Sequence, residues 1–258
     1  MKKCINLKYM SYLLFESLLA RTFSILLLIV LSQMNIFAQF PESMSLDEQR
    51  RILESAQMSL ESYKETISNS IYKDLEMNPI GDEQNGYWEK ISQGYMKSGL
   101  NWSLFQRKLP NGKIEQTLAF GGTEFFNRAS KTKHIDIRDI WTDIIQGVGI
   151  LPRQYKDAID VTNHYIEKAK INPDLSISVA GHSLGGSIAQ FVGYTLGIMA
   201  YVFNSAPLVA HYCEIKKEEN LFKTVNVYNK ADVFHSLPGA QLGKMYPLDH
   251  SPETIDKF

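Results

Sequence analysis

The sequence contains few cysteines, no excess of charge of one sign and no long hydrophobic run. Its 258 residues include only two cysteines, Cys4 and Cys213, too few for a disulfide framework or a four-cysteine zinc site. The 27 basic and 28 acidic residues leave a net charge of -1, so no basic surface is available to attract phosphates, and we expect no nucleic-acid partner. The hydrophobic content of 44% is that of a soluble globular protein.

The first 38 residues have the layout of an export signal. Basic residues precede an apolar segment, Phe23 to Leu31, and the small residue Ala38 stands before a polar segment. The uninterrupted apolar run, Ile25 to Leu31, is far shorter than the roughly 20 residues that a membrane-spanning helix needs. The pattern predicts a signal peptide over 1–38, an exported protein (periplasmic or secreted) and a single domain over 39–258. An uncleaved signal that anchors the chain in the membrane is the alternative.

An amphipathic helix is predicted over residues 45–75. Ser45 and Glu48 form the two ends of a capping box. Behind them Leu46, Leu53 and Leu60 recur every seven residues, which indicates one apolar stripe. We expect the stripe to cover the helix's own domain, with partner binding or a coiled coil as the alternative.

The chain from residue 101 onward, taken as the catalytic core over 101–258, reads as strands alternating with helices. Asn111-Gly112 between two apolar runs predicts a β-hairpin. Further on, strand and helix patterns alternate, which predicts an α/β fold with a mostly parallel central sheet and helices on both faces. The predicted elements are hairpin strands 101–109 and 113–120, a helix over 152–170, a strand over 175–180, a helix after 186, and strands over 199–203 and 224–228.

The segment Gly181-His182-Ser183-Leu184-Gly185 lies between a predicted strand and a predicted helix. This is the G-x-S-x-G pattern in the context it requires. A strand that enters a helix through one tight turn holds the serine hydroxyl above the carboxyl edge of the sheet, and the following helix directs its N–H groups to the same place. Ser183 is therefore the candidate nucleophile.

A serine hydroxyl needs a base within hydrogen-bonding reach and an acid that orients the base. In this architecture the acid and then the histidine follow the serine along the chain. Asp232 follows a predicted strand and is the candidate acid, and His250 is the candidate base. His211 precedes the acid, and His235 is too close to it in sequence to turn back over the serine.

The candidate oxyanion hole combines two backbone N–H groups. The first belongs to Leu184, directly after the nucleophile. The second belongs to Thr123, after the Gly121-Gly122 pair that ends a hairpin strand and lets the backbone approach a substrate. The alternative is that this glycine pair only turns the chain.

Four segments resemble, in order and spacing, the class 3 lipase-like family of the α/β-hydrolase superfamily. They are FGGT at 120–123, DIWTD at 139–143, GHSLGG at 181–186 and ADVFHSLP at 231–238. The end of the chain after His250 is similar to the short ending of some bacterial, exported members. After Phe203 the chain differs, with NSAPLV at 204–209 where the family often has a Gly-x-Pro-Arg-Val-Gly run.

The resemblance implies hydrolysis of acylglycerol or phospholipid esters through an acyl-enzyme. Ser183 is then the nucleophile, His250 the base and Asp232 its orienting acid, with Thr123 and Leu184 as oxyanion donors. A small-molecule or lipid ester would be the substrate, with transient contact with a lipid surface and no metal or cofactor. An amidase or peptidase with the same triad, and a non-catalytic binding protein of the same fold, are the alternatives. Residues 124–151 fit either a lid or ordinary core packing, and no pattern sets an oligomeric state.

Overall fold

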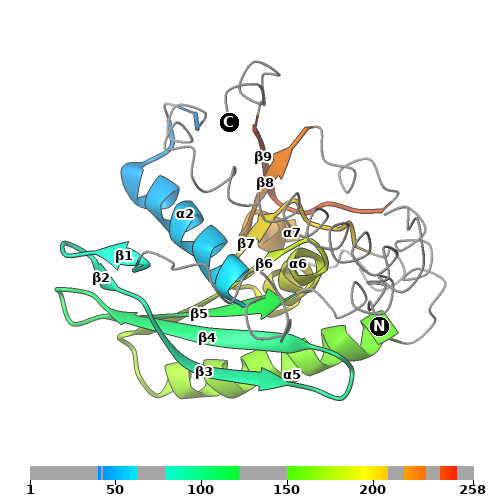
Figure 1. Cartoon of the computed structure of the whole chain (residues 1–258), viewed down its shortest axis with the longest axis horizontal. Coiled ribbons are helices and arrows are strands. Elements are labelled where there is room, and N and C mark those ends of the chain that lie inside the picture. The colour runs from blue at the N-terminus through cyan, green and yellow to red at the C-terminus, as the bar shows by residue number, and fades with distance from the viewer. Residues whose placement is uncertain are drawn as a thin grey trace, which may run out of the picture.

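The protein is built around a seven-stranded sheet (Figure 1). In this computed structural model the described residues are 40–41, 43–62, 79–121, 150–208, 218–230 and 239–248. The predicted signal peptide over 1–38 lies outside them. The order of the strands across the sheet is their order in the sequence. They are β3 (Glu89–Tyr95), β4 (Asn101–Lys108), β5 (Ile114–Gly121), β6 (Leu175–His182), β7 (Met199–Phe203), β8 (Thr224–Asn229) and β9 (Lys244–Leu248). Two short strands, β1 (Gly81–Asp82) and β2 (Gly86–Tyr87), pair separately.

Strands β5 to β9 are parallel, and β3 and β4 are antiparallel additions at one edge. The predicted hairpin is present as β4 and β5, which pair from Lys108 and Ile114 at the turn to Asn101 and Gly121 at the far end. Gly112 takes a φ of +85° in this turn, a value that glycine adopts without steric cost. The prediction of a mostly parallel sheet in an α/β fold is therefore confirmed.

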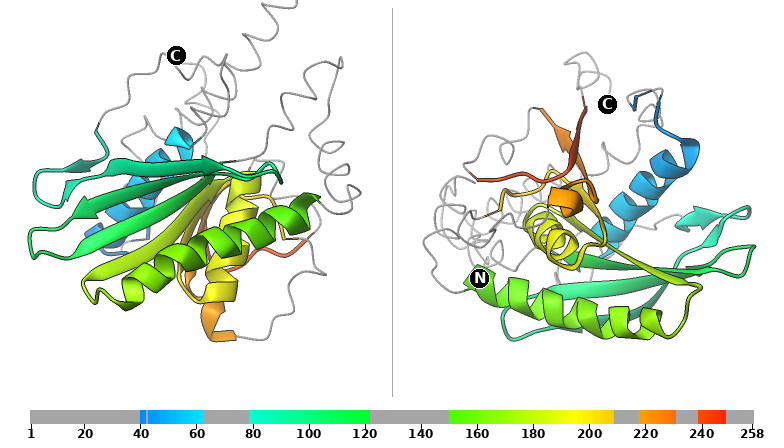
Figure 2. Two further views of the ribbon diagram at one scale, coloured as in Figure 1. Left: turned by 90° about the horizontal axis from the view of Figure 1, so that it is seen from below. Right: turned by 180° about the vertical axis from the view of Figure 1, so that it is seen from behind.

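Helices cover both faces of the sheet (Figure 2). On one face lie α5 (Ile150–Lys170) and α6 (Leu184–Leu196), and on the other lies α2 (Leu46–Glu61). Alternate residues of the strands supply the two cores because successive side chains point to opposite faces. The α5/α6 side buries Leu118, Phe120, Val179, Val202, Ile188 and Val192. The α2 side buries Ala180, Tyr201, Val225, Val227, Ile52 and Ala56. A short helix, α7 (Glu218–Leu221), precedes β8.

Helix α2 begins as its capping sequence predicts. The Ser45 side chain caps the helix by accepting a hydrogen bond from the Glu48 N–H at 3.2 Å. The helix packs on the sheet of its own chain, as expected. The predicted stripe is wrong at its start, however, because Leu46 is 72% exposed while Ile52 and Met58 are buried. A straight helix drifts away from a seven-residue repeat, so the residues that face the sheet do not recur at every seventh position along the whole helix.

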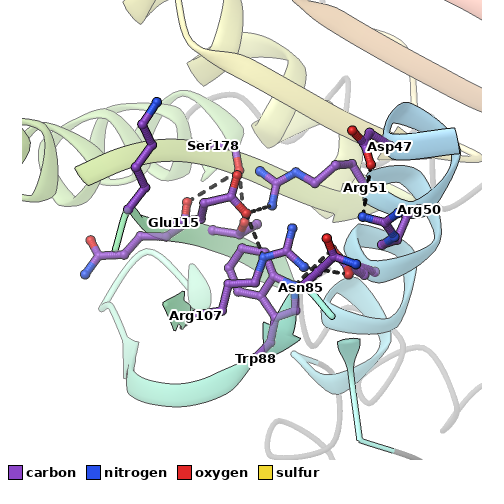
Figure 3. Close-up of polar contacts among 12 residues, drawn as sticks. Asp47, Arg50, Arg51, Asn85, Trp88, Arg107, Glu115 and Ser178 are labelled. Carbon is purple, nitrogen blue, oxygen red and sulfur yellow. Dashed lines mark hydrogen bonds and ion pairs between the residues drawn. The ribbon is translucent and has the colours of Figure 1, made fainter. Parts of the chain in front are cut away.

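A buried ionic cluster fastens α2 to the start of β5 (Figure 3). Arg107 of β4 forms a 2.7 Å ion pair with Glu54 of α2 through Nη1, and a second of 2.7 Å with Glu115 of β5 through Nε. Arg51 of α2 also binds Glu115, at 2.9 Å. The Trp88 indole N–H donates to Glu54 at 3.0 Å, and the Arg107 guanidinium lies 4.7 Å from the Trp88 ring centroid. This cluster lies at the opposite end of β5 from Gly121.

Removing Arg107 should destabilise the fold because Glu54 would keep a buried charge without its main partner. Burial raises the pKa of Glu54, and Arg107 opposes that rise. We expect Arg107→Met to cost about 3 to 5 kcal/mol in free energy of unfolding. In the variant, loss of Arg107 lets the pKa of Glu54 rise further, so Glu54 is more easily protonated in the folded state. The loss of free energy of unfolding should therefore be smaller at pH 5 than at pH 8. Urea unfolding at both pH values measures this difference.

The matched control for that experiment is the double variant Glu54→Gln/Arg107→Met, which removes the orphaned charge. It should recover part of the lost stability at pH 8. Equal stability of the single and double variants at pH 8 would contradict the account.

Candidate active site

Ser183 occupies the turn between β6 and α6. Its backbone has φ 55° and ψ −123°, and it is one of two residues other than glycine with positive φ in the described part of the chain. An L-residue is strained in this conformation, so surrounding contacts must hold it. The Ser183 N–H donates to the Phe203 carbonyl at 3.1 Å, and its carbonyl accepts from the Ala206 N–H at 3.0 Å. The predicted sharp turn at the serine is therefore present.

Two glycines permit the chain to pass this closely. A Cβ on Gly181 would overlap the carbonyl oxygen of Gly185, and a Cβ on Gly185 would overlap the carbonyl oxygen of Phe120 at the end of β5. Neither glycine has a positive φ, so the backbone conformation alone would allow another residue. Glycine is required at both positions because there is no room for a Cβ atom. A side chain larger than that of glycine would therefore clash with the backbone at both positions. The start of α6 consequently lies directly against the end of β5.

Leu184 is the first residue of α6, which places its backbone N–H among the groups that a helix leaves without an intrahelical acceptor. The helix thus begins at Leu184, three residues earlier than the predicted start after residue 186. Strand β5 ends at Gly121, two residues before Thr123. Because Gly185 contacts Phe120, Leu184 lies close to the strand end that leads to Thr123. Thr123 itself lies outside the described residues, so its role stays a prediction.

The predicted acid and base also follow strand ends. Strand β8 ends at Asn229, three residues before Asp232, and β9 ends at Leu248, two residues before His250. Because β6, β7, β8 and β9 are parallel neighbours, their carboxyl ends lie on one edge of the sheet, the edge that carries Ser183. Asp232 and His250 lie outside the described residues, as do His211, His235 and residues 124–149, and their roles remain predictions.

Contacts with α5 hold the first turn of α6 in place. The Tyr155 hydroxyl and the Ser187 hydroxyl form a buried hydrogen bond of 2.7 Å. Ser187 Oγ also donates to the Pro207 carbonyl at 3.3 Å. The Tyr155 ring stacks on Phe191 with centroids 4.3 Å apart. These contacts hold the nucleophile's helix between α5 and the segment after β7.

A buried amide network joins α6 to the segment that leads into β9. Gln190 donates to Ser205 Oγ at 2.5 Å and to Gln241 Oε1 at 2.9 Å, and its own Oε1 accepts from the Leu242 N–H at 2.8 Å. Asn226 of β8 donates to the same Gln241 oxygen at 2.9 Å. Our sequence reasoning missed this network, which ties the β9 end of the connection that carries Asp232 to α6 and β8.

His182 is a buried neutral histidine. It ends β6, where it pairs with Phe203 of β7. Burial removes water from the ring and lowers the pKa of His182 to about 4. At neutral pH the imidazole of His182 is therefore uncharged.

Acidification should destabilise the protein through His182. The pKa is lower in the folded chain than in the unfolded chain, so the unfolded state binds the proton first as the pH falls. Neutral His182 therefore makes its full contribution to the free energy of unfolding above about pH 6.5. This contribution falls by about 3 kcal/mol in total as the pH is lowered to about 4. Urea unfolding of wild type and His182→Gln over this range measures it. A stability difference between the two proteins that does not vary with pH would contradict the assignment.

None of the residues that the structure describes form a cluster of His, Cys, Asp or Glu suited to hold a metal ion. Among these same residues no helix has the length and apolar character to cross a bilayer.

A family model of Tle-like phospholipase domains matches residues 54–234 of the chain. The chain belongs to this phospholipase-like family. The match covers strands β1 to β8, the Ser183 turn and part of α2 but not β9, and it supports the lipase-like resemblance drawn from the motifs.

Individual relatives are also lipases by name. A Penicillium rubens protein named as a lipase, atg15, is 30% identical over 165 residues, which is 50% of this chain. The chain spans only 24% of that relative's length. Among solved structures, a lipase from Rhizopus microsporus var. chinensis is 13% identical with a TM-score of 0.48, over 78% of this chain and 76% of that one. Lipase II from Rhizopus niveus is 14% identical with a TM-score of 0.47, over 76% of each chain.

Proposed function

We propose that this chain is a serine hydrolase that cleaves carboxylic esters, as a lipase or phospholipase. The observation that carries the proposal is the strained conformation of Ser183 at the carboxyl edge of the sheet, directly before the start of a helix. Backbone strain that surrounding contacts maintain is a common feature of functional sites. Membership of the phospholipase-like family supports the choice of ester substrates.

The proposed reaction proceeds through an acyl-enzyme. His250 accepts the proton of Ser183 while the serine oxygen attacks the ester carbonyl, and Asp232 stabilises the imidazolium that forms. The backbone N–H groups of Leu184 and Thr123 hold the oxyanion of the tetrahedral intermediate. His250 then returns the proton to the leaving alcohol. Water, deprotonated by the same histidine, releases the acid and regenerates Ser183.

Lipid esters are the proposed substrate class. The family name and the lipase name of the Penicillium relative both support a substrate whose acyl chain is esterified to glycerol, in an acylglycerol or a phospholipid. Substrates of this kind lie in membranes or droplets, so the enzyme would make transient contact with a lipid surface.

A substrate panel tests this proposal directly. The full chain is assayed on nitrophenyl esters of increasing acyl length, on triacylglycerol and phospholipid vesicles, and on peptide anilides. We expect ester hydrolysis that rises with acyl length and is far faster than anilide hydrolysis. Activity on anilides alone would replace the proposal with an amidase or peptidase, and inactivity on every substrate would favour a binding protein of this fold.

We also propose that the chain is an exported bacterial member of its family, with residues 1–38 as the signal. The basic residues, the short apolar segment and Ala38 support this. Mass spectrometry of the protein recovered from the periplasm or medium of an expressing bacterium should give a chain that starts at Gln39. Recovery of the full-length chain in the membrane fraction would favour the uncleaved anchor.

A further inference from the structure

We propose that Asn204 is a positioning residue that holds the end of β8, from which the chain leads to Asp232, relative to Ser183, an inference that rests on the proposed function. Asn204 follows β7 and lies between the nucleophile turn and the end of β8. It contacts the backbone on the β8 side, and its two flanking segments contact Ser183.

The segment from Phe203 to Ala206 is bonded to both neighbouring strand ends. On one side, the Phe203 carbonyl accepts from the Ser183 N–H at 3.1 Å, and the Ala206 N–H donates to the Ser183 carbonyl at 3.0 Å. On the other side, the Asn204 N–H donates to the Val227 carbonyl of β8 at 2.9 Å. A displacement of this segment would therefore move both the nucleophile turn and the end of β8.

Asn204 is the second residue other than glycine with positive φ in the described part of the chain, at 39°. Asparagine tolerates this region better than most residues because its short side chain can form local hydrogen bonds. Here the side chain instead reaches the next strand, where its Oδ1 accepts from the Asn229 N–H at 2.7 Å. The bond is buried, and Asn204 is 9% exposed. The positive φ directs the amide towards β8.

Asn229 is the last residue of β8, and Asp232 follows it by three positions. The hydrogen bond that Asn229 donates to Asn204 Oδ1 fixes the end of β8, where the chain leaves the sheet towards Asp232. At the other end of the same connection, Gln241 is bound by Gln190 and Asn226. A small displacement of an orienting group costs much in rate because catalysis depends on near-ideal geometry. Asn204 therefore couples the strained serine turn to the end of β8.

Three substitutions at this position separate the backbone from the side chain. Asn204→Gly keeps the positive φ and removes the acceptor, Asn204→Ala loses both, and Asn204→Asp keeps an acceptor oxygen. We expect Asn204→Gly to lower kcat on a nitrophenyl ester on the order of tenfold with KM nearly unchanged, and Asn204→Asp to retain most of the activity. Ser178→Ala is the control, because it breaks a buried 2.9 Å hydrogen bond with Thr117 in mid-sheet and should leave kcat unchanged.

A double-mutant cycle with Asp232→Asn distinguishes positioning from general stability. If Asn204 acts through the acid, the loss caused by Asn204→Gly should disappear in the Asp232→Asn background. Additive losses, or an Asn204→Gly variant with wild-type kcat, would overturn the inference. Full activity of Asp232→Asn alone would overturn the triad and this inference together. Thermal unfolding of each variant confirms that the compared proteins are folded.

Discussion

Replacing Ser183 by alanine should lower kcat by about 10^4-fold or more on any ester that the wild type hydrolyses. The hydroxyl is the only group in the account that forms a covalent bond to the acyl carbon, so no neighbouring residue can replace it. Steady-state kinetics of the two proteins on the same nitrophenyl ester measure the effect.

The fold should survive this substitution because the Ser183 backbone bonds to Phe203 and Ala206 do not involve the hydroxyl. Thermal unfolding of Ser183→Ala should therefore stay close to that of wild type. Loss of activity in a folded variant assigns the effect to chemistry. Hydrolysis by Ser183→Ala at the wild-type rate would remove Ser183 from the mechanism.

The second large effect is expected at Gly185. A Cβ at this position would overlap the Phe120 carbonyl oxygen and approach Gly121 to 3.1 Å. Both partners are backbone, so the start of α6 must move away from β5, which separates the Leu184 N–H from the strand end that leads to Thr123. We expect Gly185→Ala to lower kcat/KM by about 10^2 to 10^3-fold, the effect of losing one oxyanion donor.

The matched control is Gly112→Asn in the β4–β5 turn. That glycine also has a special role, with φ +85°, but a Cβ there would meet nothing within 4 Å, and asparagine tolerates positive φ. The control should keep wild-type kcat/KM. Gly185→Ala with unchanged kcat/KM would show that the contact between α6 and β5 has no part in catalysis.

The parallel strands and the nucleophile turn could be predicted because both are dictated by local sequence. Strand β7 over Met199–Phe203 is a short apolar run between breakers, and the glycines around Ser183 report a close approach of backbone to backbone. Such signals depend on neighbours in sequence and need no knowledge of the tertiary structure.

The two edge strands, β3 and β9, were not predicted because their local sequence does not resemble that of a strand. Strand β3 is mostly exposed and polar, so it lacks the apolar alternation that identifies a strand. Strand β9 contains Pro247, which normally argues against a strand. Proline is tolerated at a sheet edge because one side of an edge strand has no partner that needs its N–H. Position in the sheet, which the sequence does not reveal locally, decides both cases.

The buried polar contacts were also beyond sequence reasoning, both those beside the Ser183 turn and those at the far end of β5. Gln190 and Gln241 lie 51 positions apart, and Glu54 and Arg107 lie 53 apart. Buried polar groups of this kind are recognised by their partners, and these come together only in the fold. Asn204 gave one signal: it comes directly after Phe203, where the family that the motifs resemble often begins a run with glycine, and its φ is positive.

The central claim is that the Ser183 hydroxyl is an activated nucleophile at the carboxyl edge of the sheet. The most direct test is to treat the folded full chain with a fluorophosphonate and locate the modification by peptide mass spectrometry. The account predicts one labelled residue, Ser183, in a stoichiometry near one per chain, and no label on Ser183→Ala. An unlabelled wild type, or equal labelling of wild type and Ser183→Ala, would contradict it.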